Sequence, residues 1–559
     1  MLNRSLKLLT CLCLVVSICH GQPSVTITQG ALEGVDITTL GGRTISGFLG
    51  IPYGRPPVGR LRFKAPQPAL PWNGTYSATN GTIRCTQVLD GPIKGREDCL
   101  YLNVYTPQLP SNSTASLPVM VYIFGGGFVV GAARIDLYGP NFIMDHDVVL
   151  VTINYRLGPL GFMTTGDKEA PGNFGLKDQI LALRWVQSNI GAFGGDPNQV
   201  TLFGNSAGAT FTHVLTLSDQ TEGLFHKFIL ESGSATSIWA FRDSSEAYQI
   251  TMDLAESLNC STATTRTVVR CLRNRSAESI MSYSANVSGY AFIPTNESVS
   301  LAPVITDSPR NLVKQGKMRK LPWMCGITSD EGLLFSSYYI DDQSQWDNVL
   351  AAINSSVDSV TDLLRGGGRR TEYLNAIRTN YFNNLNADKS VILQNYTDLM
   401  SDSYFVYPLV DLLKTQQGTG SPAPYVYVYD YTGTYSLTFR ATGNATVLGA
   451  CHGDENFYLF SRSDPTYVPP GRNMTATDLE MVRRLTGLWT SFAINGTPAL
   501  ADQKDAEDVD EWVPYDEENR NYLRIGNKKN VSLVLESGLF ENRVRFWTDL
   551  IGSFISNGA

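Results

Sequence analysis

The sequence predicts an α/β fold in which a mostly parallel central sheet is flanked by helices within one large domain. Three observations indicate this fold. Uncharged β-branched stretches alternate with segments of helical periodicity, no internal repeat or linker interrupts the chain, and its 559 residues are 43% hydrophobic. Uncharged strands between amphipathic helices are typical of a parallel sheet that is covered on both faces.

The individual elements follow from their composition. Buried strands are expected where short apolar runs are rich in β-branched and aromatic residues, at 118–124 (PVMVYIF), 148–154, 199–203, 228–230 and 323–327. Apolar residues at helical spacing predict helices at 178–190, at 207–215 and near the C-terminus, where Val544, Trp547, Ile551 and Phe554 share one face. The order of strands and helices is that of an α/β domain.

Residues 1–21 have the pattern of a secretory signal peptide, followed by one domain at 22–559. Arg4 and Lys7 precede an apolar run at 8–18 that is too short to span a bilayer, and small residues stand before Gln22. We therefore expect a secreted, extracellular protein.

The cysteines and the asparagine sequons agree with export. Six of the nine cysteines follow the signal peptide: Cys85, Cys99, Cys260, Cys271, Cys325 and Cys451. The pairs 85/99 and 260/271 would each close a small loop, as an oxidising compartment permits. Asn-x-Ser/Thr sequons predict a glycosylated surface. The candidates are Asn73, Asn80, Asn112, Asn274, Asn286, Asn296, Asn354, Asn395, Asn444, Asn473, Asn495 and Asn530. Asn259 is left out because it adjoins Cys260.

Charge and composition exclude several kinds of partner. The net charge is −8 and no basic stripe is present, so neither nucleic acid nor an anionic membrane surface is expected as a partner. No CxxC motif favours a metal site, and none is predicted. The longest uncharged run after the signal, 117–133, contains three consecutive glycines, so no stable membrane anchor is expected. The sequence gives no indication of the oligomeric state.

The stretch FGNSAGA at 203–209 is the strongest candidate for a catalytic element. It follows a predicted strand and precedes a predicted helix, which is the context of a Gly-x-Ser-x-Gly nucleophile turn. Such a turn brings the positions two before and two after the serine into near contact, so Gly204 and Gly208 can carry no side chain. Ser206 is therefore predicted to be a nucleophile, and a serine needs a base to accept its proton.

The chain order required by this type of site selects the partners of Ser206. After the signal peptide only His146, His213, His226 and His452 are available as the base, and His452 alone stands well after the serine. An acid is expected between serine and histidine. The stretch TSDEG at 328–332 follows a predicted strand, and the residues themselves leave Asp330 and Glu331 open as that acid.

Glycines that follow another predicted strand suggest donors for an oxyanion. In FGGGF at 124–128, backbone N–H groups could approach a substrate oxygen closely. The alternative is a dinucleotide-binding turn of the form Gly-x-Gly-x-x-Gly. That alternative is disfavoured because the third glycine, Gly131, comes one position too late and no helical pattern follows.

Seven motifs follow one another along the chain: IPYGRPPVGRLRF at 51–63, EDCLYLNVYTP at 97–107, FGGGF, GNFGLKDQ at 172–179, GNSAGA, SDEG and GACHGDE at 449–455. In this order they resemble those of the type-B carboxylesterase family, which includes the cholinesterases and juvenile hormone esterases. The resemblance runs from about residue 52 to 547, nearly the whole mature chain. It implies the α/β-hydrolase fold and hydrolysis of small-molecule carboxylic esters without a cofactor.

The resemblance also implies roles for individual residues. Ser206 would be the nucleophile, His452 the general base and acid, and Glu331, rather than Asp330, the carboxylate that orients the imidazole. The oxyanion would be bound by the N–H groups of Gly126, Gly127 and Ala207, and Ser232 would support the triad from behind. The family pairing implies the disulfides Cys85–Cys99 and Cys260–Cys271, with Cys325 and Cys451 as free buried thiols.

Departures from the family pattern bear on the substrate. Asn205 stands before the nucleophile where glutamate is most frequent, and the loop 85–99 is short and contains no tryptophan. A tryptophan ring that could bind a choline cation and a carboxylate beside the serine are therefore both missing. Their absence argues against choline esters and favours neutral, hydrophobic ones. Phe124 replaces a frequent histidine, but the oxyanion donors are backbone groups.

Two further functions are compatible with the same fold. One is a catalytically silent adhesion or binding ectodomain, which the retained serine, acid, histidine and glycine run disfavour. The other is an esterase that sequesters a ligand on Ser206. A lipase acting on long acyl chains is a further alternative among the enzymes.

Overall fold

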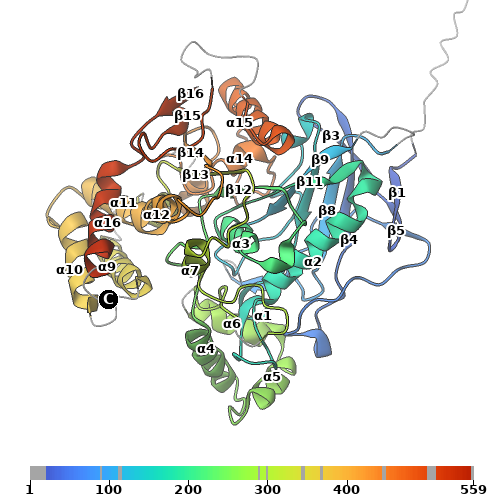
Figure 1. The fold of residues 1–559 in the computed structure, drawn as a ribbon, viewed down its shortest axis with the longest axis horizontal. Coiled ribbons are helices and arrows are strands. Elements are labelled where there is room, and N and C mark those ends of the chain that lie inside the picture. The colour runs from blue at the N-terminus through green and yellow to red at the C-terminus, as the bar shows by residue number, and fades with distance from the viewer. Residues whose placement is uncertain are drawn as a thin grey trace, which may run out of the picture.

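The computed structural model describes residues 21–88, 91–110, 116–287, 290–297, 300–340, 346–364, 369–443, 448–499 and 511–555. The signal peptide expected at 1–21 lies outside these residues, except for Gly21. The sequons at Asn112 and Asn444 also lie outside them. Figure 1 shows the arrangement of the elements.

An eleven-stranded sheet forms the centre of the molecule, in the order β16-β15-β14-β13-β12-β11-β9-β10-β8-β4-β3. The pairs from β15 through to β10 are parallel, and the pairs at both ends of the sheet are antiparallel. The strands are β3 Val35–Thr38, β4 Thr44–Pro52, β8 Tyr101–Thr106, β9 Leu117–Ile123, β10 Val149–Ile153, β11 Gly195–Asn205, β12 Lys227–Glu231, β13 Trp323–Thr328, β14 Tyr425–Tyr431, β15 Tyr522–Lys528 and β16 Asn530–Glu536. The predicted mostly parallel sheet is therefore confirmed.

All five predicted strands lie in the parallel part of this sheet. Strands β10 and β13 are buried along their whole length, and β9 is buried except at Leu117. Side chains on both faces of these strands are covered, which is why their sequences are continuously apolar and do not alternate.

Helices cover both faces of the sheet. In Figure 1, α2 (Phe174–Asn189) and α3 (Ala207–Thr216) lie on one side of the strands and α15 (Ala476–Asn495) on the other. Helix α3 is buried at every position, including its single histidine. This helix begins directly after the predicted nucleophile and runs from the end of β11 into the core.

Two helical groups extend the central layers. Helices α4 (Ser244–Ser257), α5 (Thr265–Arg273) and α6 (Ala277–Asn286) form one group, at the bottom of Figure 1. Helices α9 (Trp346–Leu363), α10 (Arg370–Tyr381), α11 (Lys389–Ser401), α12 (Tyr407–Thr415) and α16 (Glu541–Ile555) form the other, on the left. Within α16, Val544 and Trp547 are buried, as their spacing predicted.

Short elements complete the fold. Strands β1 (Ser24–Ile27), β2 (Gly30–Glu33) and β5 (Thr75–Ser77) form a small separate sheet, and β6 (Gln87–Val88) pairs with β7 (Ile93–Lys94). The remaining short helices are α1 Gly158–Phe162, α7 Pro309–Lys314, α8 Leu333–Ser336, α13 Thr438–Thr442 and α14 Asn456–Leu459. Among the helices that the structure describes, none is both long and apolar enough to cross a membrane.

Both predicted disulfides are present. Cys85 is bonded to Cys99 and Cys260 to Cys271, with Cα–Cα distances of 5.0 and 5.8 Å. Cys325 and Cys451 are buried free thiols, and burial raises the pKa of both. The high pKa keeps these two thiols protonated and unreactive.

Removing each disulfide is expected to have different consequences for activity. The bonds close loops of 14 and 11 residues, so replacing either cysteine pair by alanine should cost about 3 kcal/mol of stability. Because the 85–99 loop carries pocket residues and the 260–271 loop carries none, only Cys85→Ala/Cys99→Ala should also raise KM. Thermal inactivation and steady-state kinetics on both variants check this. Equal KM values in the two variants would contradict it.

Candidate active site

Ser206 occupies a strained turn between β11 and α3. Its backbone angles are φ 60° and ψ −125°, which a residue with a side chain rarely adopts. A Cβ atom on Gly204 would lie 2.7 Å from the backbone of Gly208, and one on Gly208 only 2.0 Å from the carbonyl oxygen of Ile123. The two flanking glycines are thus required by contact, as the sequence pattern predicted. The Ser206 N–H donates to the Glu231 carbonyl at 2.8 Å, which fixes the turn against β12.

A pocket of about 550 Å³ opens over this turn. Ser206 and His452 both line it, together with Gly125, Gly126 and Gly127. The turn after β11, the loop after β9 and the loop after β14 therefore meet at the carboxyl edge of the parallel strands. Ligand sites of open α/β sheets lie at this edge.

His452 is held by a buried carboxylate. Its Nδ1 lies 2.5 Å from Oε2 of Glu331, which has no exposed surface. The other oxygen, Oε1, accepts from the Ser232 hydroxyl at 2.5 Å and from the Thr328 N–H at 2.8 Å. With Oε1 occupied by two donors, Oε2 is left for the imidazole. This arrangement favours the tautomer in which Nδ1 carries the proton and Nε2 is free to act as a base.

The neighbouring carboxylate is directed elsewhere. Asp330 accepts a hydrogen bond from the Ser329 hydroxyl at 2.7 Å and lies against Gly449. Burial raises its pKa. Of the two acids that the residue pattern left open, the structure brings Glu331 to the histidine.

The other three histidines have partners of their own. His146 Nε2 lies 3.0 Å from the Thr486 hydroxyl. The Nδ1 atoms of His213 and His226 accept backbone N–H groups at 3.1 and 3.2 Å. Burial lowers the pKa of His213 to about 3, so this ring is neutral. None of the three lines the pocket.

The glycine run lies directly against the serine turn. A Cβ atom on Gly125 would be 2.5 Å from the Asn205 carbonyl oxygen and 2.8 Å from the Ser206 Cβ. Gly126 and Gly127 have φ values of 120° and 58°. Among the described residues, the N–H groups of Gly126, Gly127 and Ala207 donate no hydrogen bond. Three free donors beside a serine hydroxyl are suited to a developing oxyanion.

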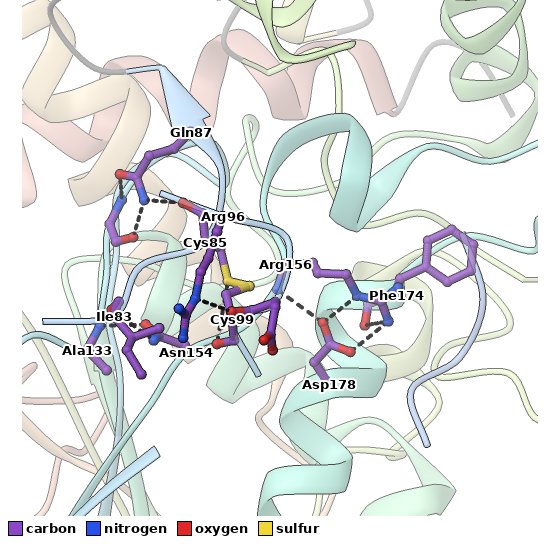
Figure 2. Close-up of a disulfide and its surroundings, with 12 residues drawn as sticks. Ile83, Cys85, Gln87, Arg96, Cys99, Ala133, Asn154, Arg156, Phe174 and Asp178 are labelled. Atoms are coloured by element: carbon purple, nitrogen blue, oxygen red, sulfur yellow. Dashed lines mark hydrogen bonds and ion pairs between the residues drawn. A yellow bond between two sulfur atoms is a disulfide. The ribbon is translucent and has the colours of Figure 1, made fainter. Parts of the chain in front are cut away.

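The Cys85–Cys99 disulfide braces one wall of the pocket. Gln87, two residues after Cys85, accepts from the Gly131 N–H at 2.9 Å and donates to the Gly131 carbonyl at 2.8 Å. Figure 2 shows Gln87 on one side of the disulfide and the buried Arg156–Asp178 ion pair on the other. The loop 85–99 is thereby tied to the segment that continues the glycine run.

Aromatic side chains form the apolar wall opposite. Phe405 packs on the His452 ring with centroids 4.6 Å apart, and Trp239 and Tyr290 also line the pocket. Phe405 belongs to a π-helical turn, Asp402–Val406, between α11 and α12. Such turns frequently mark functional sites. These three residues could not be predicted from the sequence, because they come from separate segments and share no motif.

Two further carboxyl groups lie buried behind Ser206. The indole N–H of Trp489 donates to Glu231 Oε1 at 2.7 Å, and the Asn205 amide nitrogen lies 3.4 Å from Glu455 Oε1. Burial raises the pKa of Glu231 to about 8. Burial and the nearby Glu231 raise the pKa of Glu455 as well. Glu455 stands within the GACHGDE motif and Glu231 directly precedes Ser232, so a signal for both existed in the sequence.

The raised pKa of Glu231 makes stability fall with rising pH. An unfolded glutamate loses its proton near pH 4.5, whereas folded Glu231 keeps it up to about pH 8. Its contribution is therefore present at acidic pH and lost between about pH 4.5 and 8. In Glu231→Gln, the melting temperature should fall less steeply over this range than in the wild type. Exposed Glu256→Gln is the control, and parallel curves for Glu231→Gln and the wild type would refute the assignment.

The structure gives no sign of a metal centre in the part of the chain that it describes. No group of three histidine, cysteine or acidic side chains there is arranged to hold an ion.

Most of the sequon asparagines that the structure describes lie at the surface. Asn73, Asn80, Asn274, Asn354, Asn473, Asn495 and Asn530 are exposed, and Asn296 and Asn395 are half-buried.

Comparison with known proteins gives concordant results. The sequence model of the carboxylesterase family matches residues 21–547. A carboxylic ester hydrolase of Bombus ignitus is 33% identical over 94% of both chains. Esterase FE4 of Myzus persicae is 34% identical over 92% of this chain and 90% of its own. The juvenile hormone esterase of Tribolium castaneum is 34% identical over 87% of this chain and 86% of its own.

Proposed function

The chain belongs to the carboxylesterase family of α/β-hydrolases, and from this premise we propose that it is a secreted serine carboxylesterase acting through an acyl-enzyme on Ser206. The family and its esterase relatives support hydrolysis of carboxylic esters. The proposal adds the residues, the intermediate and the kind of ester. No metal or organic cofactor takes part, because nucleophile, base and donors are all protein groups.

In the acylation step, His452, Glu331 and the backbone donors have separate roles. His452 Nε2 accepts the Ser206 proton as Oγ attacks the ester carbonyl, and Glu331 stabilises the imidazolium through its 2.5 Å contact with Nδ1. The oxyanion is bound by the N–H groups of Gly126, Gly127 and Ala207. His452 then gives its proton to the leaving alcohol, which departs as the acyl-serine forms.

The second half of the reaction repeats these roles with water. His452 takes a proton from a water molecule, whose oxygen attacks the acyl carbon and restores the oxyanion. Collapse of this second intermediate breaks the bond to Ser206 Oγ, which regains its proton from His452 as the acid is released. Ser232 holds Glu331 from behind at 2.5 Å throughout.

The observation that carries the proposal is the Glu331–His452 contact at a pocket that Ser206, Gly126 and Gly127 also line, with Ala207 next to Ser206 in the chain. A structural histidine–carboxylate pair would not need a strained serine and free donors beside it. The other hydrogen-bond partners of the buried Glu331, the Ser232 hydroxyl and the Thr328 N–H, are uncharged groups.

The pocket wall supports an ester that is neutral and hydrophobic around the scissile bond. Trp239, Tyr290, Leu334 and Phe405 present apolar surface to the pocket. The residue before Ser206 is Asn205 and not a carboxylate, so no charge stands directly beside Ser206. An apolar acyl or alcohol group would therefore gain contacts here without leaving a charge unpaired.

Secretion is supported by the predicted signal peptide at 1–21 and by the two disulfides, which form in oxidising compartments. We also propose that the domain spans 22–559 and that the exposed sequons carry glycans. Recovery of the protein from the medium tests secretion, and a glycosidase-induced mobility shift tests the glycans.

Stopped-flow hydrolysis of 4-nitrophenyl butyrate tests the proposed reaction. We expect a burst of nitrophenolate followed by steady turnover, because the activated 4-nitrophenyl ester acylates the serine faster than water releases the acyl group. A burst without turnover would instead support the sequestering alternative. Absence of any release by folded protein would support a silent binding domain.

A further inference from the structure

The charged side chains that line the pocket are almost all cationic. Arg84, Lys94, Arg134, Arg440 and Arg462 line it, whereas Asp464 is the one acid among the described lining residues. The whole chain carries a net charge of −8, so this local excess runs against the overall charge. A cleft lined by one sign of charge concentrates ligands of the opposite sign.

Two carboxylates, Asp136 and Asp464, lie close to Arg134 and also attract Arg84. Arg134 pairs with Asp136 and lies 3.4 Å from Asp464. Arg84 has no hydrogen bond or ion pair from its side chain among the described residues. Burial and repulsion from Arg134 lower the pKa of Arg84, so its charge is held at a cost in free energy. An anion placed beside Arg84 would remove that cost.

Arg462 is fixed in place without a polar partner for its Nε. Its guanidinium carbon lies 4.1 Å from the Phe457 ring centre, 5.4 Å from that of Tyr138 and 5.8 Å from that of Tyr467. The Nε atom is buried and has no hydrogen-bond partner. Stacking on aromatic faces orients a guanidinium and leaves its N–H groups for a planar anion such as a carboxylate.

We propose that the preferred substrates of this pocket are esters that carry an anionic group, such as a carboxylate, at the end remote from the scissile bond, where Arg84 and Arg462 receive it. This inference rests on the proposed function and amends one part of it: the ester is apolar around the reacting carbonyl, but the intact substrate is an anion. The apolar wall of Trp239 and Phe405 contacts the middle of such a molecule, and the basic side chains bind its charged end.

Matched substrate pairs test this preference in the unmodified protein. In one pair the acyl group differs in charge, 4-nitrophenyl hydrogen adipate against 4-nitrophenyl hexanoate. In the other the alcohol differs, 4-butanoyloxybenzoate against 4-butanoyloxybenzamide. In at least one pair kcat/KM should be about tenfold higher for the anion, as a charge-assisted hydrogen bond contributes. Added salt should reduce the ratio by screening. The pair that shows the preference identifies the half of the substrate that carries the anion.

Variants then locate the effect. Arg84→Gln and Arg462→Gln should each lower the anionic-to-neutral ratio of kcat/KM several-fold, mainly through KM of the anionic ester. Arg84→Lys keeps the charge and should retain most of the preference. Arg270→Gln, an exposed cation on α5 outside the pocket, should leave the ratio unchanged. If the Arg462 variant does not fold, the Arg84 variants and the salt dependence decide.

Three results would overturn the proposal. The first is an equal or lower kcat/KM for the anionic member of both pairs. The second is a preference for the anionic ester that salt does not change. The third is a preference for the anionic ester that survives in Arg84→Gln and Arg462→Gln. In each of these cases continued hydrolysis of the neutral esters would leave the proposed esterase function standing. Failure to hydrolyse any of the four esters would instead refute the esterase function, and with it this inference.

Discussion

Replacing Ser206 by alanine is expected to lower kcat for ester hydrolysis by roughly 10⁴- to 10⁶-fold. The variant keeps the pocket, His452 and the three free N–H groups, but it loses the atom that forms the acyl-enzyme. Alanine is smaller than serine, so the turn can accept it without new contacts. The residual rate would come from the oxyanion donors and binding alone.

The measurement is the steady-state rate on 4-nitrophenyl butyrate, with folding checked by circular dichroism. Ser188→Ala, an exposed serine on α2, serves as the control and should match the wild type. A Ser206→Ala enzyme that kept more than about a tenth of the wild-type kcat would show that another residue is the nucleophile.

Replacing Glu331 by glutamine is expected to lower kcat by roughly 10⁴-fold. Oε1 accepts two hydrogen bonds, from Ser232 and Thr328, so the glutamine oxygen is required there. The amide N–H₂ would then face His452 Nδ1 and act as a donor. The imidazole would have to take the opposite tautomer, with the proton on Nε2, and could no longer accept the serine proton.

The adjacent carboxylate provides the control for this variant. Asp330 bonds to Ser329 and makes no contact with His452 among its hydrogen bonds. Asp330→Asn should therefore stay within about threefold of the wild-type kcat. A large loss in Asp330→Asn together with a small one in Glu331→Gln would reverse the assignment of the acid.

Five of the parallel strands and the serine turn could be predicted from sequence because local constraints act there. Strands β9, β10 and β13 are apolar since both of their faces are covered, and Gly204 and Gly208 are glycines since no Cβ fits. The parallel strands β14 and β15 and the antiparallel strands at the sheet edges were not predicted. β3 and β4, for example, mix buried and exposed positions and therefore lack a continuous apolar run.

The parts of the site that were missed depend on contacts between distant segments. The residue pattern alone could not separate Asp330 from Glu331, because one position in a loop decides which carboxylate turns inward, and only the family resemblance chose Glu331. Phe405 packs on His452 because it lies in a π-helical turn, and no sequence motif predicts that turn. The cationic excess of the pocket was hidden by the acidic net charge of the chain, since its arginines are spread from residue 84 to residue 462.

The central claim is that the ester is cleaved through a covalent intermediate on Ser206, and trapping that intermediate tests it most directly. Wild-type protein would be mixed with 4-nitrophenyl butyrate, quenched with acid within the burst phase and digested for mass spectrometry. The account predicts a butyryl group on the peptide that contains Ser206, absent from the Ser206→Ala protein. Turnover with no acyl group on that peptide, or with the group on another residue, would contradict it.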